Sequence, residues 1–178
     1  HIYRGGKVSG GGVGQFGHAG GFGGAKTGPN PTDRGKKGTK RHVIVDARGT
    51  PLAIAHTAAN VHDSQMAIPL VEAIPPIKRP RGRPRKRPVE LLADAAYDAD
   101  AKIRQPLRKR GIRPRIRRRN AEHGSGLGKY RWVVEAFFAW LFHYRRLRVR
   151  YERRDDIHDA FLTIGCVLIC WNRVLEFC

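Results

Sequence analysis

Two acidic residues of this chain stand in places where a carboxylate needs a compensating charge. Asp94 directly follows a short apolar run, residues 89–93, and Glu135 lies among large apolar residues in the segment KYRWVVEAFFAWL. A carboxylate beside a core is costly unless a cation pairs with it. Mg²⁺ prefers one or two carboxylates plus substrate phosphates, and two such ions can activate an attacking oxygen and stabilise a leaving one. The pair therefore predicts a site for Mg²⁺ or Mn²⁺ that performs phosphodiester chemistry.

Each acid also has a simpler interpretation. Asp94 stands where a helix-initiating cap would stand, and Glu135 follows Arg131 by four residues, which favours an ion pair on one helical face. Taken singly, these interpretations are favoured. When the two acids are considered together, a cation site is favoured instead. A protein with 35 Lys and Arg against 15 Asp and Glu has little reason to gather acids except around a cation.

The same charge balance predicts the partner. A formal net charge of +20 is typical of proteins that bind many phosphates, so nucleic acid is the leading class, and a merely basic soluble surface is the alternative. The cysteines Cys166, Cys170 and Cys178 form no CxxC pair, which argues against a zinc site or a disulfide framework. The apolar run 160–171 is too short to span a bilayer and is typical of a core helix. No charged segment followed by an apolar one opens the chain, which predicts a cytoplasmic protein without a membrane partner.

The elements that position the two acids follow from periodicity and turn chemistry. Residues 1–28 hold more than half of the chain's 21 glycines and little aliphatic content, which predicts disorder. The remaining chain predicts an α/β fold with these elements: strands at 41–45 and 51–57 joined by a DARGT hairpin, a helix within 60–74, a strand at 89–93, a helix at 98–110, an edge strand in GIRPRIRRR, and helices at 129–147 and 157–177. Between them, PPIKRPRGRPRKRP is expected to be an extended charged loop.

Four segments carry a family resemblance: GPNPTDRGKKGTKRHVIVDARGTPLA, AANVHD, LLADAAYDA and GKYRWVVEAFFAWL with RRLRVRYERR. In order and spacing they resemble bacterial insertion-sequence transposases of the DDE type, in the group called family five, close to family four. The resemblance implies an RNase H-like mixed sheet flanked by helices, three metal-binding carboxylates, and cleavage and strand transfer of transposon-end DNA. On this match Asp94 corresponds to the family's second aspartate, Glu135 to its glutamate, and Arg131 to the arginine one helical turn before that glutamate.

The family's first aspartate has no counterpart in the chain. It is expected in a D-S-S-x-x-R-A type motif upstream of GPNP, where the chain reads GQFGHAGGFGGAKTGPNP, and Asp33 and Asp46 lie too far along to replace it. Permissible codons for Gly14–Ala19, read one base later, encode Asp-Ser-Ser-Val-Met-Arg. Residues 1–25 are therefore interpreted as disordered or out of frame, ahead of an incomplete catalytic domain at 26–178, and the chain is predicted to be inactive or severely impaired. A non-catalytic DNA-binding remnant and an unstable product without a folded state are the alternatives.

Two basic clusters, residues 78–87 and 102–119, are candidates for contact with double-stranded DNA at transposon ends and target sites. PRGRPRKRP resembles an AT-hook core, in which Arg81 and Arg83 would follow a narrow A·T minor groove and Gly82 would allow close approach, although a solvated charged loop fits equally well. In an extended GIRPRIRRR segment, alternate arginines would face one side as a row of phosphate contacts. The predicted DNA-binding residues are Arg81, Arg83, Arg85, Lys86, Arg113, Arg115, Arg117, Arg118, Arg119, Lys129 and Arg145.

Some residues near these sites favour structural roles. Trp132, Phe137 and Trp140 are predicted to be core residues rather than base-stacking groups, and His62 to cap a turn or helix. The sequence leaves the oligomeric state open, with a homodimer among the alternatives.

Overall fold

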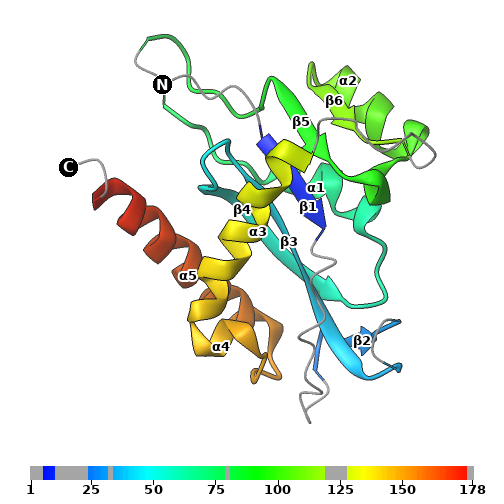
Figure 1. Cartoon of the computed structure of the whole chain (residues 1–178), viewed down its shortest axis with the longest axis vertical. Coiled ribbons are helices and arrows are strands. Elements are labelled where there is room, and N and C mark those ends of the chain that lie inside the picture. Colours follow the sequence, from blue (N-terminus) through cyan, green and yellow to red (C-terminus); the bar gives the residue numbers. More distant parts are fainter. Residues whose placement is uncertain (1–5, 11–23, 32–33, 79–80, 119–127, 176–178) are drawn as a thin grey trace.

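The computed structural model of this 178-residue chain describes residues 6–10, 24–31, 34–78, 81–118 and 128–175. The described residues form a mixed α/β structure built on one sheet (Figure 1). Its strands are β1 Gly6–Gly10, β2 Gly28–Pro29, β3 Lys37–Val45, β4 Pro51–Ala58, β5 Glu90–Ala93 and β6 Arg113–Ile116.

The long strand β3 organises the sheet. It pairs antiparallel with β4 on one side and with β1 on the other, and its first residues, Lys37 and Gly38, also pair antiparallel with the short β2. From β1 onward the pairing is parallel, first with β5 and then with β6 at the edge. Across the sheet the order is therefore β4, β3, β1, β5, β6, which leaves the predicted edge strand at an edge, where Pro114 is tolerated.

Strand β1 differs from what the sequence predicts. No regular structure is expected in residues 1–28, yet Gly6–Gly10 forms a strand whose Lys7 is paired with Val45 of β3 on one side and with Leu92 of β5 on the other. Strand pairing uses backbone groups, which glycine carries as every residue except proline does, so a glycine-rich composition disfavours a strand without excluding it. Residues 1–5 and 11–23 of the same stretch lie outside the described residues.

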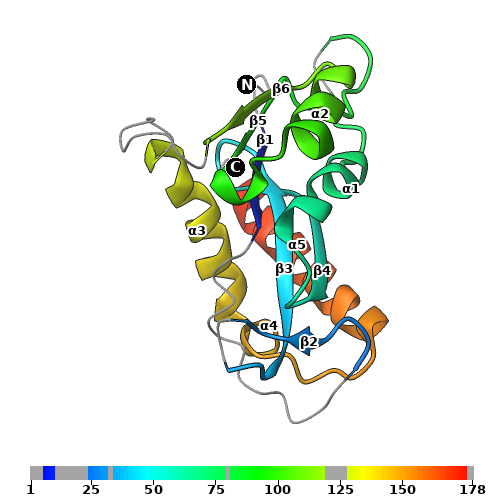
Figure 2. The same ribbon diagram turned by 90° about the vertical axis from the view of Figure 1, so that its right-hand side faces the viewer.

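Helices cover both faces of the sheet because successive strand residues point to opposite sides. On one face Ile44 and Leu91 pack against α1 Ala67–Glu72 and α2 Gln105–Lys109. On the other face, Val43 and Val45 pack against α3 Gly128–His143, α4 Arg145–Arg148 and α5 Asp155–Leu175. Figure 2 shows the sheet between α3 on one side and α1 and α2 on the other.

The β3–β4 hairpin forms as its turn residues predict. Asp46 Oδ1 accepts hydrogen bonds from the backbone N–H groups of Arg48 (2.8 Å) and Thr50 (2.9 Å), and Gly49 has a φ of +87° that favours glycine. The predicted helix at 60–74 is shorter, because a single turn at Asp63–Gln65 precedes α1. The predicted helix at 129–147 divides into α3 and α4 at Tyr144, whose ψ of 108° is extended.

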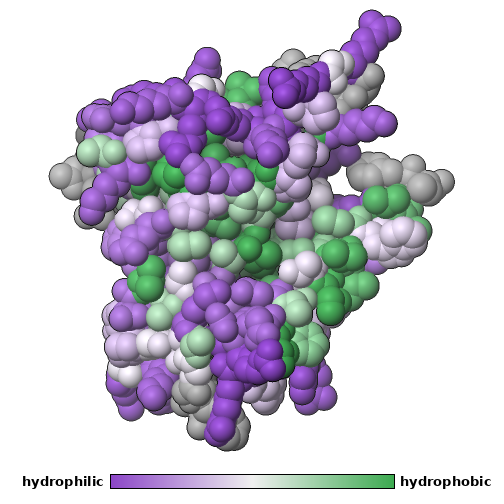
Figure 3. Space-filling model, turned by 180° about the vertical axis from the view of Figure 1, so that it is seen from behind, coloured by the Kyte–Doolittle hydropathy of each residue, from purple (hydrophilic) through white to green (hydrophobic). Residues whose placement is uncertain are grey.

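Helix α5 is less buried than a core helix. His158, Leu162, Gly165 and Ile169 form its buried side, whereas seven large apolar side chains are exposed on the rest: Ile157, Ile164, Val167, Leu168, Trp171, Val174 and Leu175. They form the apolar band over α5 in Figure 3. The expectation that this is a core helix is wrong for the exposed side of α5, and the helix extends beyond the apolar run 160–171 in both directions, as the predicted bounds of 157–177 allow. By length and composition alone, α5 could also cross a membrane, a property it shares with the core helices of soluble proteins.

The aromatic side chains of α3 are not all in the core. Phe137 is fully buried, as predicted, and Trp140 is half-buried beneath the guanidinium of Arg173, whose Cζ lies 4.2 Å from the ring centroid. Trp132 is 59% exposed, so the prediction that it is a core residue is wrong. It falls on the exposed side of α3, one turn before Ala136.

Neutral histidines join α5 to the sheet. His56 of β4 is fully buried next to His158 of α5, with ring centroids 5.0 Å apart, and His56 Nδ1 lies 2.6 Å from Asp159 Oδ1. On the opposite face of β3, His42 Nε2 lies 2.8 Å from Thr57 Oγ1. Burial lowers the pKa of His42 to about 4 and, together with the charge of Arg41, that of His158 to about 3.

The free energy of unfolding is therefore expected to fall as the pH decreases from about 6.5 towards 4.5. Both histidines have a folded pKa below their ordinary value of 6.5, so below that pH the unfolded chain binds more protons than the folded one. Each histidine can contribute up to about 1.4 kcal/mol per pH unit across that interval, and nothing above it. Urea unfolding at pH 7.5, 6.5, 5.5 and 4.5 measures the slope. His158→Gln should remove the contribution of one histidine to this slope. Equal stability at pH 7.5 and 4.5 would contradict the prediction.

Candidate functional site

Asp94 lies at the carboxyl end of β5, directly after the buried residues Leu91, Leu92 and Ala93. Its Oδ1 accepts a hydrogen bond from the backbone N–H of Ala96 at 2.9 Å, which caps a short helical turn, Ala95–Tyr97. The capping role predicted from the sequence is confirmed. It does not exclude a metal, because one hydrogen bond occupies only part of a carboxylate's acceptor capacity.

Arg104 ties the segment after Asp94 to the neighbouring strand. Its guanidinium is 7% exposed and donates to Asp98 Oδ1 from Nη2 (2.7 Å) and from Nε (3.2 Å), and Nη2 also donates to the carbonyl oxygen of Ile116 (3.0 Å), the last residue of β6. Arg104 does not stand out in the sequence, because there it is one more member of a basic cluster. The spacing of Asp98 and Asp100 six and four residues earlier is the signal that could have found it.

The NVHD segment lies against the same turn. Tyr97 is fully buried, and its pKa is raised chiefly by burial and further by the negative charges of Asp63 and Asp94. Asp63 Oδ1 lies 2.9 Å from Lys40 Nζ. His62 Nδ1 accepts the Ser64 backbone N–H at 3.2 Å, so its predicted capping role is confirmed. The turn after Asp94 is thus held on both sides, by β6 and by the segment that follows β4.

Glu135 belongs to α3, which packs on the face of the sheet opposite α1 and α2. The side chains of Leu91 and Ala93 pack in the core under α1 and α2. Asp94 is still extended, with φ −77° and ψ −179°, so strand alternation turns it away from the side of Leu91 and Ala93. Glu135 is exposed next to buried Val134. The side chain of Arg131, its predicted partner, lies outside the described part of the chain.

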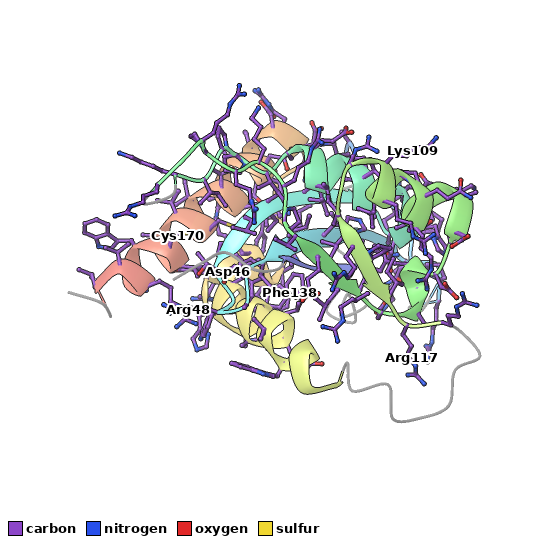
Figure 4. All side chains as sticks on the ribbon, turned by 90° about the horizontal axis from the view of Figure 1, so that it is seen from above. Asp46, Arg48, Lys109, Arg117, Phe138 and Cys170 are labelled. Carbon is purple, nitrogen blue, oxygen red and sulfur yellow. The ribbon has the colours of Figure 1, made fainter. Side chains whose placement is uncertain are left out.

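Strand β6 carries the predicted row of arginines. Ile112 and Ile116 are buried, whereas Arg113, Arg115 and the following Arg118 are exposed and Arg117 is half-buried. Figure 4 shows Arg117 pointing away from the sheet at the end of β6. Arg115 Nη1 is 3.5 Å from Glu90 Oε1 on the neighbouring strand, so part of the row is already paired. Arg145 is exposed in α4, while Arg119 and the side chain of Lys129 lie outside the described residues.

Comparison with known proteins identifies the family. A family model described as the transposase DDE domain matches residues 13–172. The chain belongs to this family. DDE transposases generally use a divalent metal ion, and a transposase acts on DNA, so the two expectations drawn from the acids and from the charge agree with the family.

Two relatives are themselves named as transposases. The chain is 59% identical over 151 residues to a protein named as a transposase for insertion sequence element IS402 in Burkholderia cepacia, a match that covers 85% of this chain and 71% of that protein. It is 32% identical over 141 residues to a protein named as a transposase for insertion sequence element IS6501 in Brucella ovis, covering 76% of this chain and 98% of that protein.

Within the part of the chain that the structure describes, the carboxylates of this DDE domain do not complete a metal site. Within the described residues, no three His, Cys, Asp or Glu side chains gather as a metal-binding group. Strand β1, which lies between β3 and β5, reads GKVSG and carries no acid. Asp94 and Glu135 are hard oxygen donors suited to Mg²⁺, but they fall short of the three carboxylates expected for the family. No reaction step through a metal ion is therefore assigned to this chain.

The basic loop of the transposase domain is not fully extended. Ile77 and Arg85 form an antiparallel bridge in which each backbone N–H donates to the other's carbonyl oxygen at 2.9 Å. The expectation that regular structure is excluded between residues 75 and 88 is wrong at this bridge, because neither bridging residue is a proline and each keeps its N–H. Residues 79–80 lie outside the described residues.

Proposed function

We propose that the chain is the RNase H-like core of an insertion-sequence transposase that binds double-stranded DNA at element ends and target sites, and whose own cleavage activity is severely impaired. The observation that carries the proposal is the position of Asp94. It ends β5, a buried strand flanked by the parallel strands β1 and β6, in a sheet of order β4, β3, β1, β5, β6. In open α/β sheets, ligands gather outside the carboxyl ends of parallel strands.

The proposed catalytic residues are Asp94, Glu135 and Arg131. Asp94 and Glu135 would hold the Mg²⁺ or Mn²⁺ ion, and a bound ion of this kind supplies activation of an attacking oxygen and stabilisation of a leaving one. Arg131 would neutralise charge one helical turn before Glu135. In the intact family the reaction is hydrolysis of a phosphodiester followed by strand transfer to target DNA. This chain would lack it for want of the first aspartate, with residues 1–25 translated out of frame.

A non-catalytic DNA-binding remnant is the second candidate. It is favoured by two features together, the acid-free strand β1 and the row of exposed arginines on β6. The two candidates share DNA binding and differ only in whether restoring an aspartate restores cleavage.

The DNA-binding part of the proposal predicts a shallower salt dependence in an Arg113→Ala/Arg115→Ala variant. Each lost phosphate contact removes about 0.9 from the slope of log K against log salt concentration, so the double variant should lose up to roughly two units. Filter binding of a duplex between 50 and 300 mM salt measures the slope. Arg108→Ala/Lys109→Ala, which removes the same charge from exposed positions on α2, is the matched control. Equal slopes for the two double variants would argue against β6 as the contact surface.

A further inference from the structure

The loop between α1 and β5 is an anchored arm with a basic tip. The bridge between Ile77 and Arg85 closes it, and Figure 1 shows the loop projecting beyond the sheet. At its base Ile77 packs against the core under α1 and α2, and Pro88 is buried. At its tip Arg81, Gly82 and Arg83 are exposed. The fold therefore holds the base and presents the tip to solvent.

The charge of this arm is not neutralised by the rest of the molecule. The neighbouring acids are engaged elsewhere, Glu72 with Arg110 and Glu90 with Arg115. Within the described residues, none of the ion pairs includes a basic side chain between Lys78 and Arg87. Arginines gathered at an exposed tip repel one another, a cost that a bound polyanion would offset.

Gly82 lies in open space at the tip of the arm. A Cβ added at this position would meet nothing within 4 Å. Its φ of +87° favours glycine by conformation. Because Gly82 has no side chain, the backbone between the two arginines can also come close to the walls of a narrow groove.

These features fit the minor groove of A·T-rich DNA better than a phosphate surface. The minor groove is only about 6 Å wide, and A-tracts narrow it further and strengthen its negative potential, which attracts inserted arginine side chains. A contact with phosphates alone would need only the charge, whereas insertion into a narrow groove also needs a tip with no side chain between the two arginines. We propose that the arm inserts Arg81 and Arg83 into the minor groove of A·T-rich duplex DNA. The proposal rests on the proposed DNA binding and adds to it a preference for base composition.

The test compares two duplexes of equal length that differ only in a central tract of A·T or G·C pairs. The full chain, titrated by fluorescence anisotropy at fixed salt, should bind the A·T duplex at least about fivefold more tightly, the lower end of the discrimination seen for one base pair. Netropsin, which occupies A·T minor grooves, should remove that difference. Arg81→Ala/Arg83→Ala should bind both duplexes equally, whereas Arg108→Ala/Lys109→Ala should keep the preference at a lower overall affinity.

Gly82→Ala changes no charge and meets no neighbouring atom, but a Cβ at a φ of +87° strains the tip, so this variant tests the shape of the tip rather than its charge. It should reduce the preference for A·T at least twofold, while circular dichroism reports an unchanged fold. Equal affinity of the wild-type chain for both duplexes would overturn the arm proposal and leave DNA binding intact. Failure to bind either duplex would overturn the proposed function itself, and with it the arm.

Discussion

A chain whose reading frame is repaired upstream of Thr27 should nick DNA that carries the element's ends, whereas the present chain should not. The repaired sequence would contain Asp-Ser-Ser-Val-Met-Arg ahead of the GPNP turn, and with it the third carboxylate. Removing one group from a catalytic set that acts as a unit commonly costs three orders of magnitude or more in rate. The expected gain on repair is therefore about a thousandfold or more. Plasmid nicking in Mg²⁺ or Mn²⁺, with EDTA as the blank, measures it.

Two variants of the repaired chain show whether the gain comes from the proposed site. Asp94→Asn and Glu135→Gln should each return nicking to the level of the present chain, because both remove a charge without removing volume. The codons of Gly14–Ala19 are an independent check, since the repair is meaningful only if they are GGA CAG TTC GGT CAT GCG. Nicking by the present chain that depends on Asp94 would refute the claim that it is impaired.

The elements with strong side-chain signals were predictable from the sequence. The β3–β4 hairpin was found because Asp46 and Gly49 have turn roles that few other residues fill. Strand β6 was found because Ile112 and Ile116 alternate with arginines, and its edge position because Pro114 would break a central strand. The carboxyl end of β5 was found because an apolar run ended on an acid.

The elements without such signals were missed. Strand β1 pairs through its backbone, so a glycine-rich sequence conceals it. The apolar periodicity of α5 fits any helix with a hydrophobic surface, and periodicity does not tell how much of that surface the protein covers. Trp132 was misplaced for the same reason. The candidate site is a middle case, since the sequence supplied the two acids and the fold shows which elements carry them, β5 for Asp94 and α3 for Glu135.

Asp98→Ala should destabilise the protein by about 3–5 kcal/mol, because it leaves the buried guanidinium of Arg104 without its carboxylate. Arg104→Met should cost less stability, because it removes the buried guanidinium itself and so leaves no buried positive charge without a partner. Urea unfolding measures both. Both variants should also loosen the turn that Asp94 caps, so in a frame-repaired chain they should lower nicking at a temperature where the protein remains folded.

Asp100→Ala is the matched control for that ion pair. Asp100 also lies near Arg104, with Oδ1 3.7 Å from Nε, but its side chain is 65% exposed against 21% for Asp98. Water screens an exposed pair, so Asp100→Ala should change stability by less than about 1 kcal/mol. The difference between the two aspartates isolates burial from charge, because both are carboxylates near the same guanidinium. Equal costs for the two substitutions would mean that Arg104 does not anchor the turn through Asp98, and the support assigned to Asp94 would then have to come from Asp63 and Tyr97 alone.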